Sequence, residues 1–183
     1  YPERQIFTFF SKKDLQSLHY NRAHRQALKD IDVSGICERY YQKEAINAVC
    51  EHLTKCFRKS LLVMATGSGK TRTILGLVKT LAEKGWVKNI LFLADRTSLV
   101  SQAYGSAKIF LDSFPLANLC DRKAEERNPN ARIIFSTYQT MHNMIDEAKD
   151  KDGKRIFTPG HFDLVICDEA HRSIYNRYQD IFN

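Results

Sequence analysis

The sequence predicts an α/β fold in which a mostly parallel sheet carries helices on both faces. Short runs that are apolar throughout alternate with longer segments whose apolar residues recur at helical spacing. Strands of this kind are typical of parallel sheets buried between two layers of helices. Polar motifs follow the first and the last of these runs, at residues 66–71 and 168–171. Ligands of such sheets bind at the carboxyl ends of the strands, so the two motifs are expected to share one site.

Two helices are predicted before the alternation begins. The first covers residues 12–30, is polar and basic, and is ended by the stretch IDVSG. The second covers residues 40–59 and has apolar residues at helical spacing from Ala45 to Phe57. Both precede the part of the chain in which the sheet is expected.

The alternating part begins at residue 60. The predicted strands cover residues 60–65, 89–94, 115–120, 131–137 and 162–167, and the third is the weakest. The predicted helices cover residues 69–85, 96–110, 138–148 and 172–182. The order of strand and helix is that of successive crossover units in one parallel sheet.

Composition and net charge limit the classes of protein that fit the sequence. The net charge of +7 makes phosphate-bearing partners plausible, although a mildly basic protein without such a partner fits equally well. Five cysteines without a C-x-x-C pair argue against a disulfide framework and a zinc site, so a reducing compartment is expected. No apolar run approaches the ~20 residues of a membrane span. The chain starts at Tyr1 without an initiator methionine and is treated as a fragment.

The stretch MATGSGKT, residues 64–71, lies between a predicted strand and a predicted helix, as a phosphate-binding loop requires. Gly67 and Gly69 allow the backbone to turn its N–H groups toward phosphate oxygens. The helix N-terminus adds a partial positive charge. Lys70 is expected to reach the β- and γ-phosphates, and Thr71 to offer its hydroxyl to Mg²⁺.

The loop departs from the G-x-x-x-x-G-K-[ST] pattern at its first position, where Met64 replaces glycine. The alternative interpretation is a glycine-rich turn before an ordinary helix. The order of strand, loop and helix favours the phosphate loop. The candidate cofactor-binding residues here are Thr66, Gly67, Ser68, Gly69, Lys70 and Thr71.

Two adjacent carboxylates, Asp168 and Glu169, follow the apolar run FDLVIC. Carboxylates held at the end of a buried strand need a cation nearby, and nucleotide-bound Mg²⁺ would supply it. Asp168 is then expected to bind the same Mg²⁺ as Thr71, and Glu169 to orient or deprotonate the attacking water. The candidate catalytic residues are therefore Lys70, Asp168 and Glu169. The alternative for this motif taken alone is a solvated helix start, because acids favour the first turn.

GSGKT followed by DEAH resembles superfamily 2 helicases and translocases, which implies a P-loop NTPase domain of RecA-like fold. The stretch ERYYQKEAI, residues 38–46, stands where this superfamily carries a glutamine motif. The resemblance implies that Gln42 reads the adenine edge, since an amide both donates and accepts. Arg39 or Tyr40 would pack on the adenine ring. The alternative is a glutamine on a helix surface.

Two further stretches, LFLADRTSLVSQA at 91–103 and STYQTM at 136–141, are similar to superfamily motifs whose loops touch the nucleic-acid backbone. The implied phosphate contacts are Arg96, Thr97, Ser98, Ser136, Thr137 and Gln139, whose side chains are of suitable types. Caps and turns explain each of them nearly as well when taken singly. His171, the last residue of the DEAH motif, would couple the ATP site to a second domain and to nucleic acid.

These motifs and DEAHRSIYN, residues 168–176, look like the motor subunit of type I restriction enzymes. The resemblance implies a first RecA-like motor domain at 38–183, preceded by a connector at 1–37. It also implies ATP-driven translocation of double-stranded DNA coupled to endonuclease cleavage, methyltransferase and specificity subunits as partners, and a prokaryotic cytoplasmic location. A second RecA-like domain, absent from this chain, would supply arginine fingers. The chain alone is therefore expected to bind ATP weakly and hydrolyse it poorly.

Other functions stay open at this point. One is a DEAH-type helicase of repair or RNA metabolism, against which the stretch HRSIYN argues. Another is a nucleotide-binding module with little catalysis, which fits the isolated chain. A small-molecule P-loop kinase would need an acceptor pocket and a lid, and the sequence indicates neither.

Overall fold

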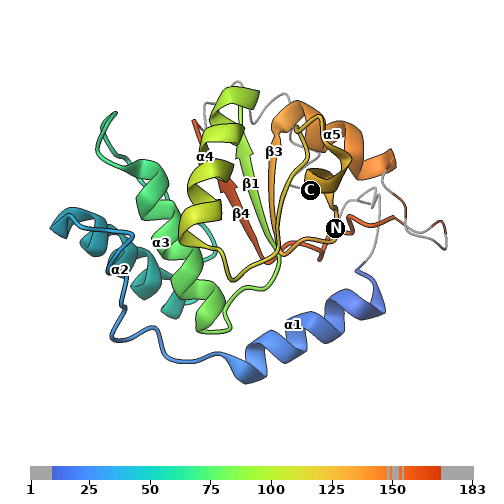
Figure 1. Cartoon of the computed structure of the whole chain (residues 1–183). Helices are drawn as coiled ribbons and strands as arrows, with labels where there is room; N and C mark the ends of the chain where they lie inside the picture. Colours follow the sequence, from blue (N-terminus) through green and yellow to red (C-terminus); the bar gives the residue numbers. More distant parts are fainter. Residues whose placement is uncertain (1–9, 148, 150–152, 154, 170–183) are drawn as a thin grey trace, which may run out of the picture.

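Within the part of the chain that the structure describes, the sheet has four strands, all parallel. The computed structural model describes residues 10–147, 149, 153 and 155–169 (Figure 1). The strands are β1 (Ile90–Ala94), β2 (Leu116–Asn118), β3 (Ile133–Thr137) and β4 (Leu164–Cys167), in the order β2-β3-β1-β4. All three pairings are parallel, which confirms the predicted sheet.

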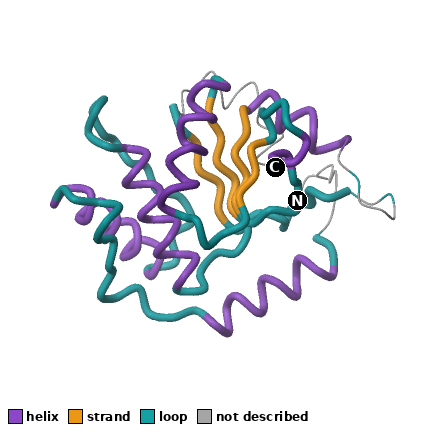
Figure 2. The backbone as a smooth tube through the Cα atoms, in the orientation of Figure 1, coloured by secondary structure: helices purple, strands orange, loops and turns teal. Residues whose placement is uncertain are grey.

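Helices cover both faces of the sheet, as predicted. They are α1 (Lys12–His24), α2 (Tyr40–Thr54), α3 (Lys70–Glu83), α4 (Thr97–Phe110) and α5 (Tyr138–Glu147), with a short 3-10 helix η1 (Ala124–Arg127). In Figures 1 and 2, α3 and α4 lie on one side of the strands, with α2 outside α3, and α5 lies on the other side. No helix among the described residues is long and apolar enough to cross a membrane.

Alternate residues of the central strand β1 face two separate cores. Ile90, Phe92 and Ala94 belong to the larger core, which α2, α3 and α4 complete. Leu91 and Leu93 belong to the smaller core, together with residues of α5. Every residue of β1 is buried, which explains why this strand is apolar throughout rather than alternating.

The prediction of a strand at residues 60–65 is wrong. The segment pairs with none of the strands that the structure describes, and the side chains of Leu61 and Val63 are 81% and 88% exposed. Leu62 packs against the larger core, so only part of the apolar run is used. A short apolar run becomes a strand only when a neighbouring strand pairs with it, and hydrophobicity alone does not supply that pairing.

The two N-terminal helices are shorter than predicted, ending at His24 and Thr54. The predicted helix at 172–182 lies outside the described residues. The division of the chain at residue 37 stays a prediction. Within the described part, Val33, Ile36 and Cys37 are buried in the larger core.

Helix α1 lies along the amino-terminal edge of the sheet, below the strands in Figure 1. One of its attachments is to Asp163, immediately before β4. Asp163 Oδ1 accepts a hydrogen bond from Asn21 Nδ2 at 3.1 Å, and Oδ2 accepts from the backbone N–H groups of Lys88 and Asn89 at 2.8 and 3.0 Å. One carboxylate therefore joins α1, the turn before β1 and the start of β4.

Replacing Asp163 tests this junction. Asp163→Ala leaves three donors without their acceptor, and we expect the free energy of unfolding to fall by about 2 kcal/mol. Urea unfolding followed by circular dichroism measures this change. Asp112→Ala, at an exposed carboxylate after α4, is the matched control and should change the free energy by less than ~0.5 kcal/mol. Equal effects of the two substitutions would contradict the role given to Asp163.

Candidate functional site

The glycine-rich loop before α3 has the backbone geometry of an anion cradle. Gly67 and Gly69 adopt φ values of +76° and +86°, in the left-handed region that glycine tolerates. Ser68 N–H donates to Ala65 O at 3.2 Å and closes the turn. Lys70 begins α3 directly after the loop, so the helix N-terminus adjoins it.

The loop and the acidic motif meet at the carboxyl edge of the sheet. Lys70 Nζ lies 3.4 Å from Glu169 Oε1, and their side chains are 38% and 42% exposed. Asp168 follows β4, and its backbone N–H donates to Leu93 O at 2.8 Å, one position beyond the paired residues of the ladder. The three predicted catalytic residues are therefore attached to the start of α3 and the end of β4.

Asp168 and Glu169 differ in their hydrogen bonds and in their backbone conformation. Asp168 Oδ1 accepts the N–H of Glu169 at 3.1 Å, and Asp168 O accepts the hydroxyl of Tyr138 at 3.2 Å. Burial raises the pKa of Tyr138, so this phenol stays a donor. Glu169 has φ +53°, an uncommon conformation for a non-glycine residue that is often found at functional sites.

A magnesium ion would find suitable donors here. Thr71 is the second residue of α3 and contributes a hydroxyl, while Asp168 contributes a carboxylate. Mg²⁺ commonly uses one or two carboxylates and completes its shell with water and substrate phosphates. No group of three or more His, Cys, Asp or Glu side chains suited to a metal occurs among the described residues. The donor set therefore suits a nucleotide-bound Mg²⁺ better than a metal held by protein alone.

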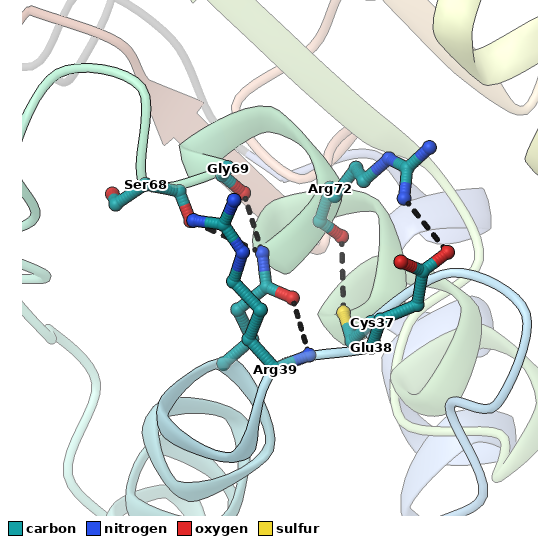
Figure 3. Close-up of polar contacts among 7 residues, drawn as sticks. Cys37, Glu38, Arg39, Ser68, Gly69 and Arg72 are labelled. Atoms are coloured by element: carbon teal, nitrogen blue, oxygen red, sulfur yellow. Dashed lines mark hydrogen bonds and ion pairs between the residues drawn. The ribbon is translucent and has the colours of Figure 1, made fainter.

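A pocket of about 230 Å³ opens beside the loop. It is lined by Glu38, Arg39, Gln42, Gly67, Gly69 and Arg72. Figure 3 shows Glu38 and Arg72 joined across one side, with Glu38 Oε1 3.2 Å from Arg72 Nη1, and Arg39 beside Ser68 and Gly69. The pocket thus adjoins the backbone that would hold phosphate.

Gln42 joins α2 to the loop and is only 3% exposed, so the alternative of a surface glutamine is wrong. Its Nε2 donates to Ser68 O and Gly69 O, at 3.2 and 3.3 Å. Its Oε1 accepts the N–H of Arg39 at 3.2 Å. In this structure the amide contacts the protein backbone, and its contact with adenine stays a prediction.

Sequence reasoning missed Tyr41. Its hydroxyl donates to Ser68 O at 3.0 Å and accepts from Arg39 Nη1 at 2.6 Å. The hydrogen bond between Arg39 and Tyr41 is the main reason that the pKa of Arg39 is raised. Tyr40, the other candidate for packing on the adenine ring, is 75% exposed and touches Tyr41 edge to face. The only signal for Tyr41 in the sequence is its place directly before Gln42.

The predicted nucleic-acid residues fall into an exposed and a buried group. Arg96, Thr97, Ser98 and Gln139 are exposed, the first three at the start of α4. Ser136 is fully buried and its hydroxyl donates to Thr137 O at 3.1 Å. Thr137 is 6% exposed, and its Oγ1 donates to Thr140 Oγ1 at 2.9 Å. Only the first group presents side chains at the surface, and His171 lies outside the described residues.

Sequence comparison identifies relatives among restriction enzymes. The chain is 33% identical over 141 residues to the type I restriction enzyme EcoKI endonuclease subunit of Escherichia coli K12, and 36% identical over 142 residues to the EcoAI endonuclease subunit of Escherichia coli. These alignments cover 73% and 77% of this chain but only 11% and 16% of the relatives. A Drosophila melanogaster DEAD-box ATP-dependent DNA helicase, Fancm, is 35% identical over 124 residues, covering 64% of this chain and 8% of the helicase.

A solved structure and a family match agree with these relatives. A nuclease-deletion mutant of the type ISP restriction-modification enzyme LlaGI, solved with a DNA substrate mimic, superposes with a TM-score of 0.58 at 26% identity, over 77% of this chain and 16% of that chain. The family described as "Type III restriction enzyme, res subunit" matches residues 36–183. The resemblance to superfamily 2 motors, and the RecA-like P-loop fold that it implied, are confirmed. The chain therefore belongs to the restriction-enzyme res-subunit family and forms its helicase-like domain.

Proposed function

We propose that this domain binds ATP with Mg²⁺ and serves as the first motor domain of a type I restriction enzyme subunit. The observation that carries the proposal is the 3.4 Å approach of Lys70 to Glu169, which brings the phosphate loop and the acidic motif together at one edge of the sheet. In this role Lys70 binds the β- and γ-phosphates, Thr71 and Asp168 hold Mg²⁺, and Glu169 orients or deprotonates water. The second motor domain would supply the arginine fingers.

The ion pair between Lys70 and Glu169 has a consequence for nucleotide binding. Lys70 has to exchange Glu169 for a phosphate oxygen, which frees the Glu169 carboxylate for water. Both side chains are substantially exposed, so the pair is worth no more than ~1 kcal/mol and opposes binding only weakly. The exchange thus links phosphate binding to release of the proposed base.

The proposal extends to DNA and to partner subunits. Exposed Arg96, Thr97 and Ser98 at the start of α4, together with Gln139, are of types that contact nucleic-acid phosphate. Ser136 and Thr137, which are buried, would hold this surface in position from beneath it. Double-stranded DNA, a second RecA-like domain, and methyltransferase and specificity subunits are the proposed partners, in a prokaryotic cytoplasm. His171 is proposed to couple the ATP site to them.

A general DNA helicase is the second candidate, because Fancm is 35% identical to this chain. The two candidates share the ATP site and differ in what stimulates turnover. A restriction motor needs its partner subunits and unmethylated target DNA, whereas a general helicase responds to nucleic acid without them. Turnover by the complete subunit, with and without partners, on unmethylated target DNA or RNA therefore separates the candidates.

A substitution at Lys70 should weaken ATP binding, whereas one at Glu169 should not. In this chain Lys70→Ala should weaken ATP binding about 10- to 100-fold, because a charged contact to phosphate is lost. Glu169→Gln removes the ion pair and should leave ATP binding equal or up to about fivefold tighter. Calorimetric titration with Mg²⁺ and ATP measures both.

In the assembled subunit Glu169→Gln should lower ATP turnover by at least about 100-fold, because the proposed base is lost. A quenched assay of phosphate release on target DNA measures the rate, with Lys70→Ala as the binding-deficient reference. Wild-type affinity for ATP in Lys70→Ala would overturn the proposed site. Brisk DNA-stimulated turnover by the present chain alone would instead contradict the need for a second domain.

The two loop glycines give a matched pair of variants. Gly67→Ala meets no neighbouring atom and suffers only the strain of its left-handed backbone, about 1–2 kcal/mol. A Cβ on Gly69 would overlap Gln42 Nε2, so Gln42 must also abandon two carbonyl acceptors. We expect Gly69→Ala to lower both ATP affinity and the free energy of unfolding more than Gly67→Ala does. Equal losses in calorimetry and urea unfolding would show that Gln42 does not brace the loop.

A further inference from the structure

The direction of one peptide bond decides whether the loop offers a donor to phosphate. In a trans peptide the carbonyl and the following N–H point to opposite sides, and no cis peptide occurs among the described residues. Ser68 O accepts its hydrogen bonds from α2. The N–H of Gly69 must therefore point away from α2. The orientation of Ser68 O sets the orientation of a donor in the phosphate loop.

Two side chains hold Ser68 O, and they are not equivalent. Gln42 Nε2 lies 3.2 Å from Ser68 O and 3.3 Å from Gly69 O, so it is shared between two carbonyls. Gly69 O also accepts the backbone N–H and the hydroxyl of Thr73, at 3.0 and 3.1 Å. Among the described residues, Ser68 O accepts no backbone N–H group of α3, and the hydroxyl of Tyr41, at 3.0 Å, donates to Ser68 O alone.

Arg39 determines how the Tyr41 hydroxyl uses its single proton. A phenol has one O–H donor, and a guanidinium only donates. Since Arg39 Nη1 donates to Tyr41 at 2.6 Å, the oxygen of Tyr41 is an acceptor on that side and its proton is left for Ser68 O. A donor cation also strengthens the next hydrogen bond in the chain. Arg39 lines the pocket beside the loop, so the relay runs from this pocket to the loop backbone.

We propose that Tyr41 is a positioning residue for the phosphate loop: its hydroxyl, oriented by Arg39, fixes Ser68 O against α2 and thereby keeps the Gly69 N–H directed toward bound phosphate. The proposal rests on the nucleotide binding proposed above and assigns to Tyr41 no contact with the nucleotide itself. Tyr41→Phe keeps the ring, with its edge contact to Tyr40, and removes only the hydroxyl.

The test compares three ligands that separate phosphate from base. ATP, inorganic tripolyphosphate and adenosine are titrated, with Mg²⁺ where phosphate is present, into the wild-type chain and Tyr41→Phe. We expect about three- to tenfold weaker binding of ATP and tripolyphosphate and unchanged binding of adenosine. A purely structural defect would lower the melting temperature of the ligand-free chain instead, and we expect that temperature to stay within ~2 °C.

Controls separate this inference from the proposed function. Tyr20→Phe, at an exposed tyrosine on α1, should leave all three affinities unchanged. Arg39→Met should weaken tripolyphosphate binding, and adding it to Tyr41→Phe should weaken binding by less than the product of the two single effects, because both act through one relay. Arg39→Met also tests the relay if Tyr41→Phe does not fold.

Each outcome has a distinct meaning. Wild-type affinities in Tyr41→Phe, or a loss confined to adenosine, would overturn the role of Tyr41 while Lys70→Ala still reports the phosphate site. Fully multiplicative effects in the double variant would overturn the relay through Arg39. A wild-type chain that binds neither ATP nor tripolyphosphate would overturn the proposed function and this inference together.

Discussion

The pairing of β4 with β1 is the constraint on which the rest of the site depends. Ile90 to Leu93 lie in register with Leu164 to Cys167, and the N–H of Asp168 continues the ladder to Leu93 O at 2.8 Å. Because alternate residues of β1 face two different cores, a shift of register by one residue would move each side chain from the core that it fits to the other one. The burial of β1 thereby fixes where the chain leaves β4, and so where Asp168 and Glu169 begin.

The charged groups of the site contribute little to holding the fold together. The pair of Lys70 and Glu169 is substantially exposed, and Glu169 occupies a left-handed backbone conformation that carries a cost. Stability comes instead from the two apolar cores and from the junction around Asp163 at the opposite edge. The Asp163 junction and the proposed chemistry therefore lie at opposite ends of the strands.

Apolar runs in the sequence predicted most of the strands correctly. The prediction failed where the structure depends on which strands pair or on which side chains meet. Strands β1 and β3, which are buried at every residue, lie within the predicted ranges because continuous burial favours apolar residues. Strand β4 also lies within its predicted range, although its residues are only partly buried or exposed. Residues 60–65 are also mostly apolar, but they pair with no strand in the described part of the chain. The hydroxyls of Ser136 and Thr137 suit phosphate by type, yet burial directs them inward. Tyr41 carries no motif of its own, and only the fold brings it to Ser68.

Helix α2 shows why a residue next to a recognised motif can matter as much as the motif. Gln42 and Tyr41 are consecutive, yet both reach the same carbonyl of a loop 26 or 27 residues further along the chain. Their convergence requires the start of α2 to lie against the start of α3, and Gly76 permits this, since a Cβ there would come within 3.0 Å of Ile46 in α2. A glycine in the middle of α3 costs helix stability and allows close packing. The geometry of the phosphate loop thus depends on how closely two helices pack two turns away from it.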